Sequence, residues 1–175
     1  AVFFRHALKV VNGGLGSLPS NGLQGLTIAS ENPVYVQGNF NACGTPTQSC
    51  SNVATAFGPT GDAHRSAAVL ADSVTLLSRA WDDMNSFNHP HNPGGRDAMT
   101  TWYRMAVISG KGLTFPHPGN GEFANFGSDG GAHNFLRFLE NWGSGSTIYY
   151  RGSMVSLFTS RQAVGTWKCC VNVYA

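Results

Sequence analysis

The chain has 175 residues and a formal net charge of +2; 42% of its residues are hydrophobic and only 11% are charged. Its hydrophobic content excludes a disordered chain, and its length suits one domain with a core of its own. The basic residues are scattered, which argues against a nucleic-acid or anionic-membrane surface. No apolar stretch reaches the roughly 20 residues that a membrane-spanning helix needs.

Glycine is abundant, with 22 residues, and glycine and asparagine accept the left-handed backbone angles of tight turns. This composition predicts a mainly β domain with many turns. A surface with so few charges resists association poorly, so we expect neighbouring subunits to cover part of it. Residues 1–4 and 171–174 have the composition of strand interiors, which favours a processed chain or a fragment of a longer pilus-associated protein.

Short runs rich in β-branched residues predict strands along much of the chain. Residues 26–29 and 34–38 flank a corner marked by Pro33, which stands where a strand can begin. Residues 67–78 fit either one amphipathic helix or two strands that break near Asp72. The two-strand interpretation is favoured because residues 26–29, which are predicted to form a strand, have a similar residue pattern. Further strands are predicted at 100–109, 147–158, 163–168 and 171–174.

One helix is predicted, over residues 132–142, because apolar side chains recur there with helical spacing and form one face. Asp129 precedes this segment as a candidate cap, and Gly143 follows it as a stop. The apolar residues are Phe135, Leu136, Leu139 and Trp142.

The predicted strands are joined by corners rather than by two-residue hairpin turns. Residues 105–108 and 154–158 are apolar at consecutive positions, which is typical of parallel strands covered on both faces. Although no exact repeat period is visible, these features favour one mainly β domain over residues 1–175, an irregular parallel β-solenoid of the β-helix type. Its coils would bury a common interior, and the helix at 132–142 would cap an open end.

Four cysteines make disulfides a candidate feature. Cys43 and Cys50 enclose a short loop, and their spacing is too wide for one half of a zinc site. Cys169 and Cys170 are adjacent and would point to opposite faces of a strand, so they form a vicinal disulfide or pair elsewhere. An even number of cysteines in a Gly/Asn-rich chain favours an oxidising, extracellular setting, with buried free thiols as the alternative.

Four stretches stand out in order along the chain: residues 25–41, 69–78, 130–142 and 150–158 with 164–167. They resemble segments of large PilX-type pilus-assembly proteins of acidobacterial type. The resemblance implies a pilin-like surface role in pilus assembly, with a β-solenoid-like C-terminal region and no catalytic residues to carry over. The apolar N-terminal helix typical of that family is not among these 175 residues.

Constellations that could carry chemistry are incomplete. Asp82 and Asp83 would diverge on a strand, whereas glycoside hydrolysis needs two carboxylates that flank the bond. A turn role is therefore favoured over a polysaccharide enzyme acting through either residue.

His89 and His91 would need a third metal ligand, for which His64, His117 or an aspartate is a candidate, but their surroundings have the composition of a plain loop. Residues 128–131 match only part of a calcium loop. We expect no enzyme, no cofactor and no bound metal.

Four aromatic residues are candidates for binding sugars or partner chains, the alternative being that they fill the core. They are Trp81, Trp102, Tyr149 and Tyr150. We expect a structural subunit of an extracellular pilus-like filament that self-assembles through strand and surface contacts. Its partners would be further copies of itself and other pilin-like subunits, without nucleic acid or a membrane span. The alternative is an adhesive or carbohydrate-binding module on a pilus or cell surface.

Overall fold

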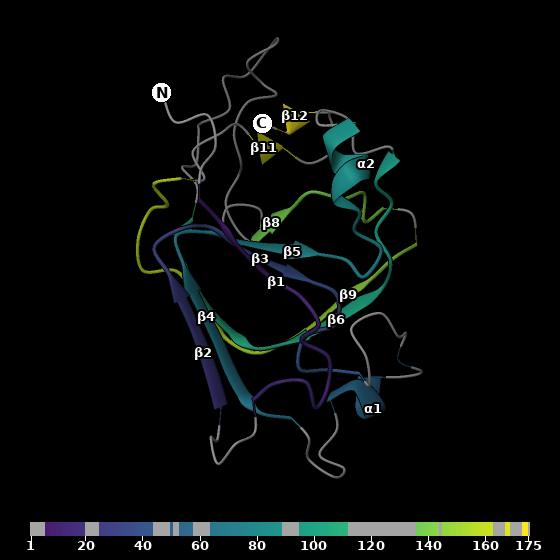
Figure 1. The fold of residues 1–175 in the computed structure, drawn as a ribbon, viewed down its shortest axis with the longest axis vertical. Helices are drawn as coiled ribbons and strands as arrows, with labels where there is room; N and C mark the ends of the chain where they lie inside the picture. Colours follow the sequence, from purple (N-terminus) through teal and green to yellow (C-terminus); the bar gives the residue numbers. More distant parts are fainter. Residues whose placement is uncertain are drawn as a thin grey trace, which may run out of the picture.

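The computed structural model describes residues 6–19, 25–43, 50, 53–57, 64–88, 95–111, 136–143, 145–162, 167–168 and 173–174. These residues are mainly β, with two four-stranded parallel sheets and smaller pairings beside them (Figure 1). The two helices among them are short, α1 (Val53–Phe57) and α2 (Asp83–Asn88). Within the described residues, no helix has the length and apolar character needed to cross a membrane.

Parallel neighbours make up sheets A, B and C. Sheet A has the order β1 (Leu8–Val10), β3 (Val34–Gln37), β5 (Val74–Leu77) and β8 (Leu136–Phe138). Sheet B has the order β10 (Met154–Val155), β7 (Ala106–Ser109), β4 (Ser66–Ala71) and β2 (Gly25–Ser30). Sheet C pairs β6 (Thr101–Arg104) with β9 (Ile148–Arg151). Separately, β11 (Trp167–Lys168) and β12 (Val173–Tyr174) pair antiparallel.

The chain passes through the three sheets in a fixed order, from A to C to B. One pass runs from β5 through β6 to β7, and the next described pass runs from β8 through β9 to β10. In the pass that starts with β3 and ends with β4, Phe40 takes the place of a strand in sheet C, because it bridges Tyr103 of β6. Parallel pairing requires such crossovers, since consecutive strands cannot turn back directly. We refer to sheets A, B and C together as the strand stack.

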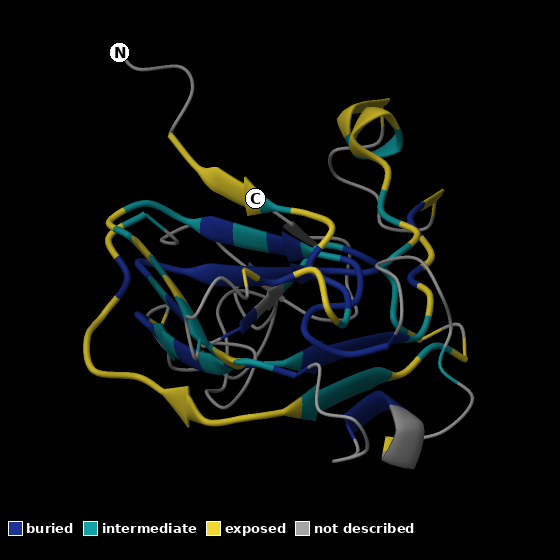
Figure 2. Ribbon diagram, turned by 60° about the horizontal axis from the view of Figure 1, so that its bottom comes forward, coloured by how far each residue is buried: buried dark blue, intermediate teal, exposed yellow. Residues whose placement is uncertain are grey.

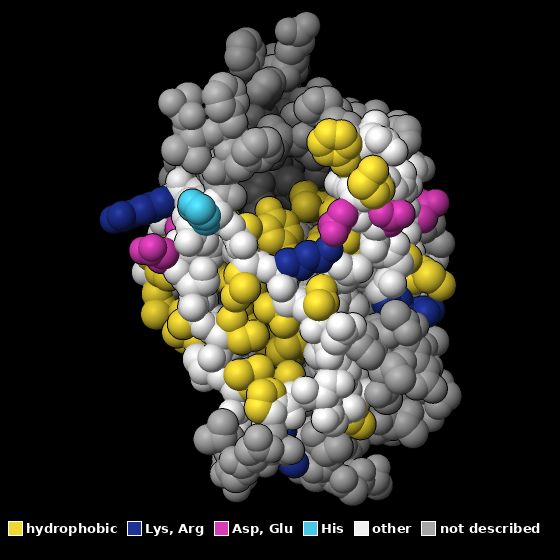
Figure 3. Space-filling view, viewed as in Figure 1, with side chains coloured by type: hydrophobic (Ala, Val, Ile, Leu, Met, Phe, Trp, Pro, Cys, Tyr) yellow, Lys and Arg dark blue, Asp and Glu magenta, His cyan; other side chains and the backbone are white. Residues whose placement is uncertain are grey.

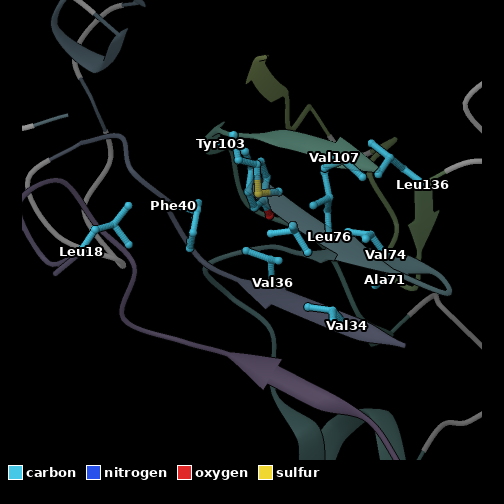
Figure 4. Packing of buried hydrophobic residues seen from close by; sticks show 12 residues of the cluster. Leu18, Val34, Val36, Phe40, Ala71, Val74, Leu76, Tyr103, Val107 and Leu136 are labelled. Atoms are coloured by element: carbon cyan, nitrogen blue, oxygen red, sulfur yellow. The ribbon is translucent and has the colours of Figure 1, made fainter. Parts of the chain in front are cut away.

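The core lies inside the strand stack, where side chains from the three sheets meet (Figure 4). The alternation of side chains along a strand decides which residues of β3 enter the core. Val34 and Val36 are fully buried, whereas Tyr35 between them is half-buried. Burying one such aliphatic side chain contributes roughly 1.5–3 kcal/mol. The parallel register places side chains of the same kind above one another, as in the column of Val34, Val74 and Leu136.

Several predicted strands are confirmed. Residues 67–78 form two strands, β4 and β5, which are separated at Asp72 and Ser73. The parallel pairing expected for residues 105–108 and 154–158 is confirmed where β7 and β10 pair with each other, but the expected cover on both faces is wrong for β10, whose two residues are exposed at the edge of sheet B. Residues 100–109, expected as one strand, break at Met105 into β6 and β7, which belong to different sheets. Residues 1–4, 163–166 and 171–172 lie outside the described part of the chain.

The predicted helix over residues 132–142 is wrong wherever the structure describes it. Leu136–Phe138 is strand β8, and residues 139–142 are not helical. A short run of apolar residues fits a helical face and a buried strand equally well. Here β8 pairs with β5 and buries Leu136 to 2% exposure, so tertiary pairing overrides the helical pattern. Asp129 and residues 132–135 lie outside the described residues.

Candidate functional site

Two of the predicted binding aromatics lie together on sheet C. Trp102 of β6 and Tyr149 of β9 are register partners, and their rings stack 5.2 Å apart with an interplanar angle of 12°. Ala42 and Phe57 belong to the same apolar cluster. Trp102 is only 3% exposed, and its indole N–H has no hydrogen-bond partner among the described residues. This pair is packed as a second small core on the flank of the strand stack.

The other two aromatics lie elsewhere. Tyr150 points to the opposite face from Tyr149, and its hydroxyl donates a hydrogen bond to the backbone oxygen of Met105 at 2.7 Å. Burial raises the pKa of Tyr150 to about 12. Trp81 is half-buried just before α2, and its indole N–H donates to Asp83 Oδ1 at 2.6 Å. The four aromatic residues therefore do not form one continuous binding platform.

The disulfide predicted between Cys43 and Cys50 is present, with 5.6 Å between the two Cα atoms. Cys43 is 2% exposed and belongs to the Trp102 cluster. The disulfide therefore lies directly against the flank of sheet C. Cys169 and Cys170 lie outside the described residues.

The two neighbouring aspartates have different local roles. Asp82 Oδ1 accepts a hydrogen bond from the backbone N–H of Met84 at 2.8 Å, so it caps the start of α2. Asp83 forms an ion pair with Lys9 of β1, with 2.7 Å between Lys9 Nζ and Asp83 Oδ2. Hydrogen bonds from Lys9 and Trp81 lower the pKa of Asp83. This exposed ion pair joins α2 to β1.

Of the residues considered for metal binding, His89, His91 and residues 128–131 lie outside the described residues.

Residues 158–162, which we name the corner strap, run across the corners between sheets B and A. The backbone N–H of Lys111, after β7, donates to the oxygen of Phe158 at 3.1 Å. The amide Nε2 of Gln162 donates to the backbone oxygen of Glu31, after β2, at 3.2 Å. The strap therefore contacts three successive passes of the chain: the pass that ends with β2, the pass that ends with β4 and the pass that ends with β7. Asp72, which follows β4, makes the middle one of these contacts.

Asp72 lies in the turn between β4 and β5 and is 8% exposed. Its carboxylate accepts hydrogen bonds from the Ser160 hydroxyl at 2.5 Å and from the backbone N–H groups of Arg161 and Gln162 at 2.8 and 2.9 Å. Charge-assisted bonds of this kind are the stronger hydrogen bonds in proteins. Sequence reasoning placed the strand break at this residue but missed its contact with a segment almost ninety residues later.

A second buried carboxylate lies beyond sheet A. Glu140 is 4% exposed and accepts hydrogen bonds from the backbone N–H and the hydroxyl of Ser78, each at 2.5 Å. Burial raises the pKa of Glu140, whereas the hydrogen bonds from Ser78 and the charge of Arg96 act in the opposite direction. This contact ties the segment after β8 to the end of β5. No sequence motif marked it.

Strand β10 and most of β1 and α2 are exposed (Figure 2), and large apolar side chains are among their exposed residues. We define two ends of the strand stack: the β1 end comprises β1 with the adjoining Val11, β2 and α2, and the β10 end comprises β8, β9 and β10 with the residues that follow β10. Ten large hydrophobic residues are exposed among the described residues, and eight of them lie at these ends. At the β1 end they are Leu8, Val11, Met84 and Phe87; at the β10 end they are Met154, Val155, Leu157 and Phe158.

The outer strands of sheet B lack two of the features that usually protect a sheet edge, charged residues and prolines, although β10 has a third, because it is only two residues long. Neither β2 (Gly25–Ser30) nor β10 (Met154–Val155) contains a charged residue or a proline. Natural edge strands commonly carry such residues, because an exposed edge is a template for pairing with another chain. Hydrophobic side chains also form a band across the face that carries β1 and β2 (Figure 3). The two ends of the strand stack are therefore the candidate interaction site.

Comparison of the chain with protein-family models, curated proteins and solved structures finds no match.

Proposed function

We propose that the protein is a structural subunit of an extracellular pilus-like filament, and that its strand stack is an irregular β-solenoid whose ends join neighbouring copies. One observation carries the proposal. Eight of the ten exposed large hydrophobic side chains among the described residues gather at the two ends of the stack, where the edge strands of sheet B carry neither charge nor proline. Surfaces of this kind mark sites of association in soluble proteins.

Contact between opposite ends would produce a filament rather than a closed dimer. The β1 end and the β10 end are different surfaces, so a contact between them is heterologous. Heterologous contacts extend indefinitely unless a rotation closes them into a ring. Pairing of edge strands would add main-chain hydrogen bonds to the apolar contact.

Two further features support an extracellular setting and a pilus. The disulfide between Cys43 and Cys50 is of the kind that forms and persists in oxidising compartments. The resemblance of residues 25–41 and the later stretches to PilX-type proteins implies a part in pilus assembly, with other pilin-like subunits as further partners. The adhesive or carbohydrate-binding alternative has less support, because Trp102 and Tyr149 stack on each other within an apolar cluster.

Electron microscopy and sedimentation of the purified chain test the proposal. We expect concentrated native protein to form filaments, and Met154→Lys to raise the concentration required by at least about tenfold, because a charge would enter the contact. Met99→Lys is the matched control, since Met99 is 44% exposed and Met154 is 45% exposed, but Met99 lies outside both ends. A native chain that stays monomeric at high concentration would overturn the proposal.

A further inference from the structure

We infer that β10 of one copy pairs in parallel with β2 of the next, with Met154 opposite Ile28 and Val155 opposite Ala29. The inference rests on the proposed function, because it specifies the contact through which the filament would grow. It follows from the registers inside sheets A and B and from the burial of the residues in them.

Sheet B fixes the first part of the register. Ile28 lies opposite Val69, Val69 opposite Val107, and Val107 opposite Met154, with no shift between successive pairs. The two inner members of this column are fully buried. The outer members are not, since Met154 is 45% exposed and Ile28 is half-buried. Continuing the column from Met154 to Ile28 of a second copy would bury both outer members in the way the inner ones already are.

Sheet A gives the same displacement independently. Leu8 lies opposite Val34, Val34 opposite Val74, and Val74 opposite Leu136. Leu136 is buried at one outer strand, whereas Leu8 at the other is 42% exposed. Because the passes follow one order and parallel strands are spaced about 4.8 Å apart, a single translation aligns β8 with β1 and β10 with β2. Both sheets would then continue across the contact.

A second copy of this chain is the occupant that fits both edges together. The contact repeats the interface between successive passes of the chain. At that interface, the sheet A strand of one pass pairs with the sheet A strand of the next pass, and the two sheet B strands pair in the same way. Another copy presents two parallel edge strands with the separation and direction of those inner strands. The four strands of the contact contain two charged residues, Lys9 of β1 and Arg137 of β8, and the same register places them opposite each other. Lys9 is already paired with Asp83, which offsets the repulsion between the two positive charges.

Engineered cysteines test this register. In Ala29→Cys/Val155→Cys the two positions face outward at opposite ends of one molecule, and the proposed contact brings them within disulfide range between copies. Thr27→Cys/Val155→Cys is the matched control. Thr27 is exposed on the same face as Ala29, but its Cα would lie about 8 Å from that of residue 155, which is too far for a disulfide.

We expect oxidised filaments of the first variant to yield a linked peptide pair containing residues 29 and 155, identified by mass spectrometry, and the control to yield none. Filaments of the native chain that form while the first variant gives no such link, or the control links instead, would overturn the register and leave the proposed function standing. Absence of native filaments would overturn both. Circular dichroism of each variant confirms that it is folded before oxidation.

Discussion

Strands in the middle of the stack and strands at its ends have similar compositions but very different surroundings. In β3 and β5 both edges are paired, and Val36 and Leu76 are fully buried. In β10 only one edge is paired within the described sheets, and both residues are exposed. Composition makes a residue suitable for a strand, while its place in the stack decides whether it is buried. Burial at the ends would be completed by another copy.

The largest difference should come from truncating one leucine in the middle and another at the β10 end. Leu76→Ala removes a fully buried side chain from β5 and should lower the free energy of unfolding by about 3 kcal/mol. Leu157→Ala, at a residue 73% exposed, should change it by less than about 0.5 kcal/mol. Urea denaturation of the two variants measures both values. Equal losses would show that the β10 end is packed like the middle.

The turn before β10 depends on close backbone contact with the preceding pass. Gly152 has φ +154°, and a Cβ there would lie 1.8 Å from the backbone oxygen of Met105. Gly152→Ala should therefore detach β10, with a loss of roughly 2 kcal/mol and faster hydrogen exchange at residues 154–155.

Gly145→Ala is the control for that substitution. Gly145 also has a positive φ, +86°, but nothing lies within 4 Å of the position of its Cβ. It should lose about 1 kcal/mol from backbone strain alone, and exchange in β10 should stay slow. Rapid exchange of β10 in both variants would contradict the role of close contact at Gly152.

The corner strap should weaken when Asp72 loses its charge. Asp72→Asn replaces one acceptor oxygen with a donor facing N–H groups, so we expect a loss of about 1–3 kcal/mol. Hydrogen exchange at Arg161 and Gln162 should accelerate. Asp97→Asn is the control, because Asp97 is exposed and its carboxylate accepts a hydrogen bond from the side chain of Asn141, which lies outside the strap. Unchanged exchange at the strap in Asp72→Asn would contradict its assignment.

The smallest expected effect is the pH dependence that Glu140 contributes. Burial raises the pKa of Glu140 above its ordinary value of 4.5, so the folded state holds this proton more tightly than the unfolded chain does. The contribution to stability is complete below pH 4.5 and is lost as pH rises through the raised pKa. The stability of the native chain relative to Glu140→Gln should therefore fall with rising pH in urea titrations. A rise would show that the hydrogen bonds from Ser78 and the charge of Arg96 together outweigh burial.

Sequence reasoning predicted the strands whose signals are local. The break at Asp72 and the strand after Pro33 follow from turn residues beside β-branched runs, and both are present. The disulfide between Cys43 and Cys50 also depends on a short spacing. These features need little information from distant parts of the chain.

Three features were not predicted from the sequence: strand β8, the corner strap and the exposed ends of the strand stack. Each depends on contacts between passes that are far apart along the chain. Leu136 becomes part of a strand because β5, about sixty residues earlier, pairs with it. Asp72 holds the strap through residues almost ninety positions away. The exposure of Met154 likewise depends on the order of strands in sheet B. Residue patterns within one window carry no information about these neighbours, so neither the strap nor the exposed ends could be predicted.

Helical reconstruction of native filaments by cryo-electron microscopy tests end-to-end stacking most directly. Each copy contributes four strands to sheet A and four strands to sheet B. Because neighbouring strands are spaced about 4.8 Å apart along the axis, the axial rise per copy should be about 19 Å. An assembly built from two-fold dimers, or a rise unrelated to four strand spacings, would contradict it.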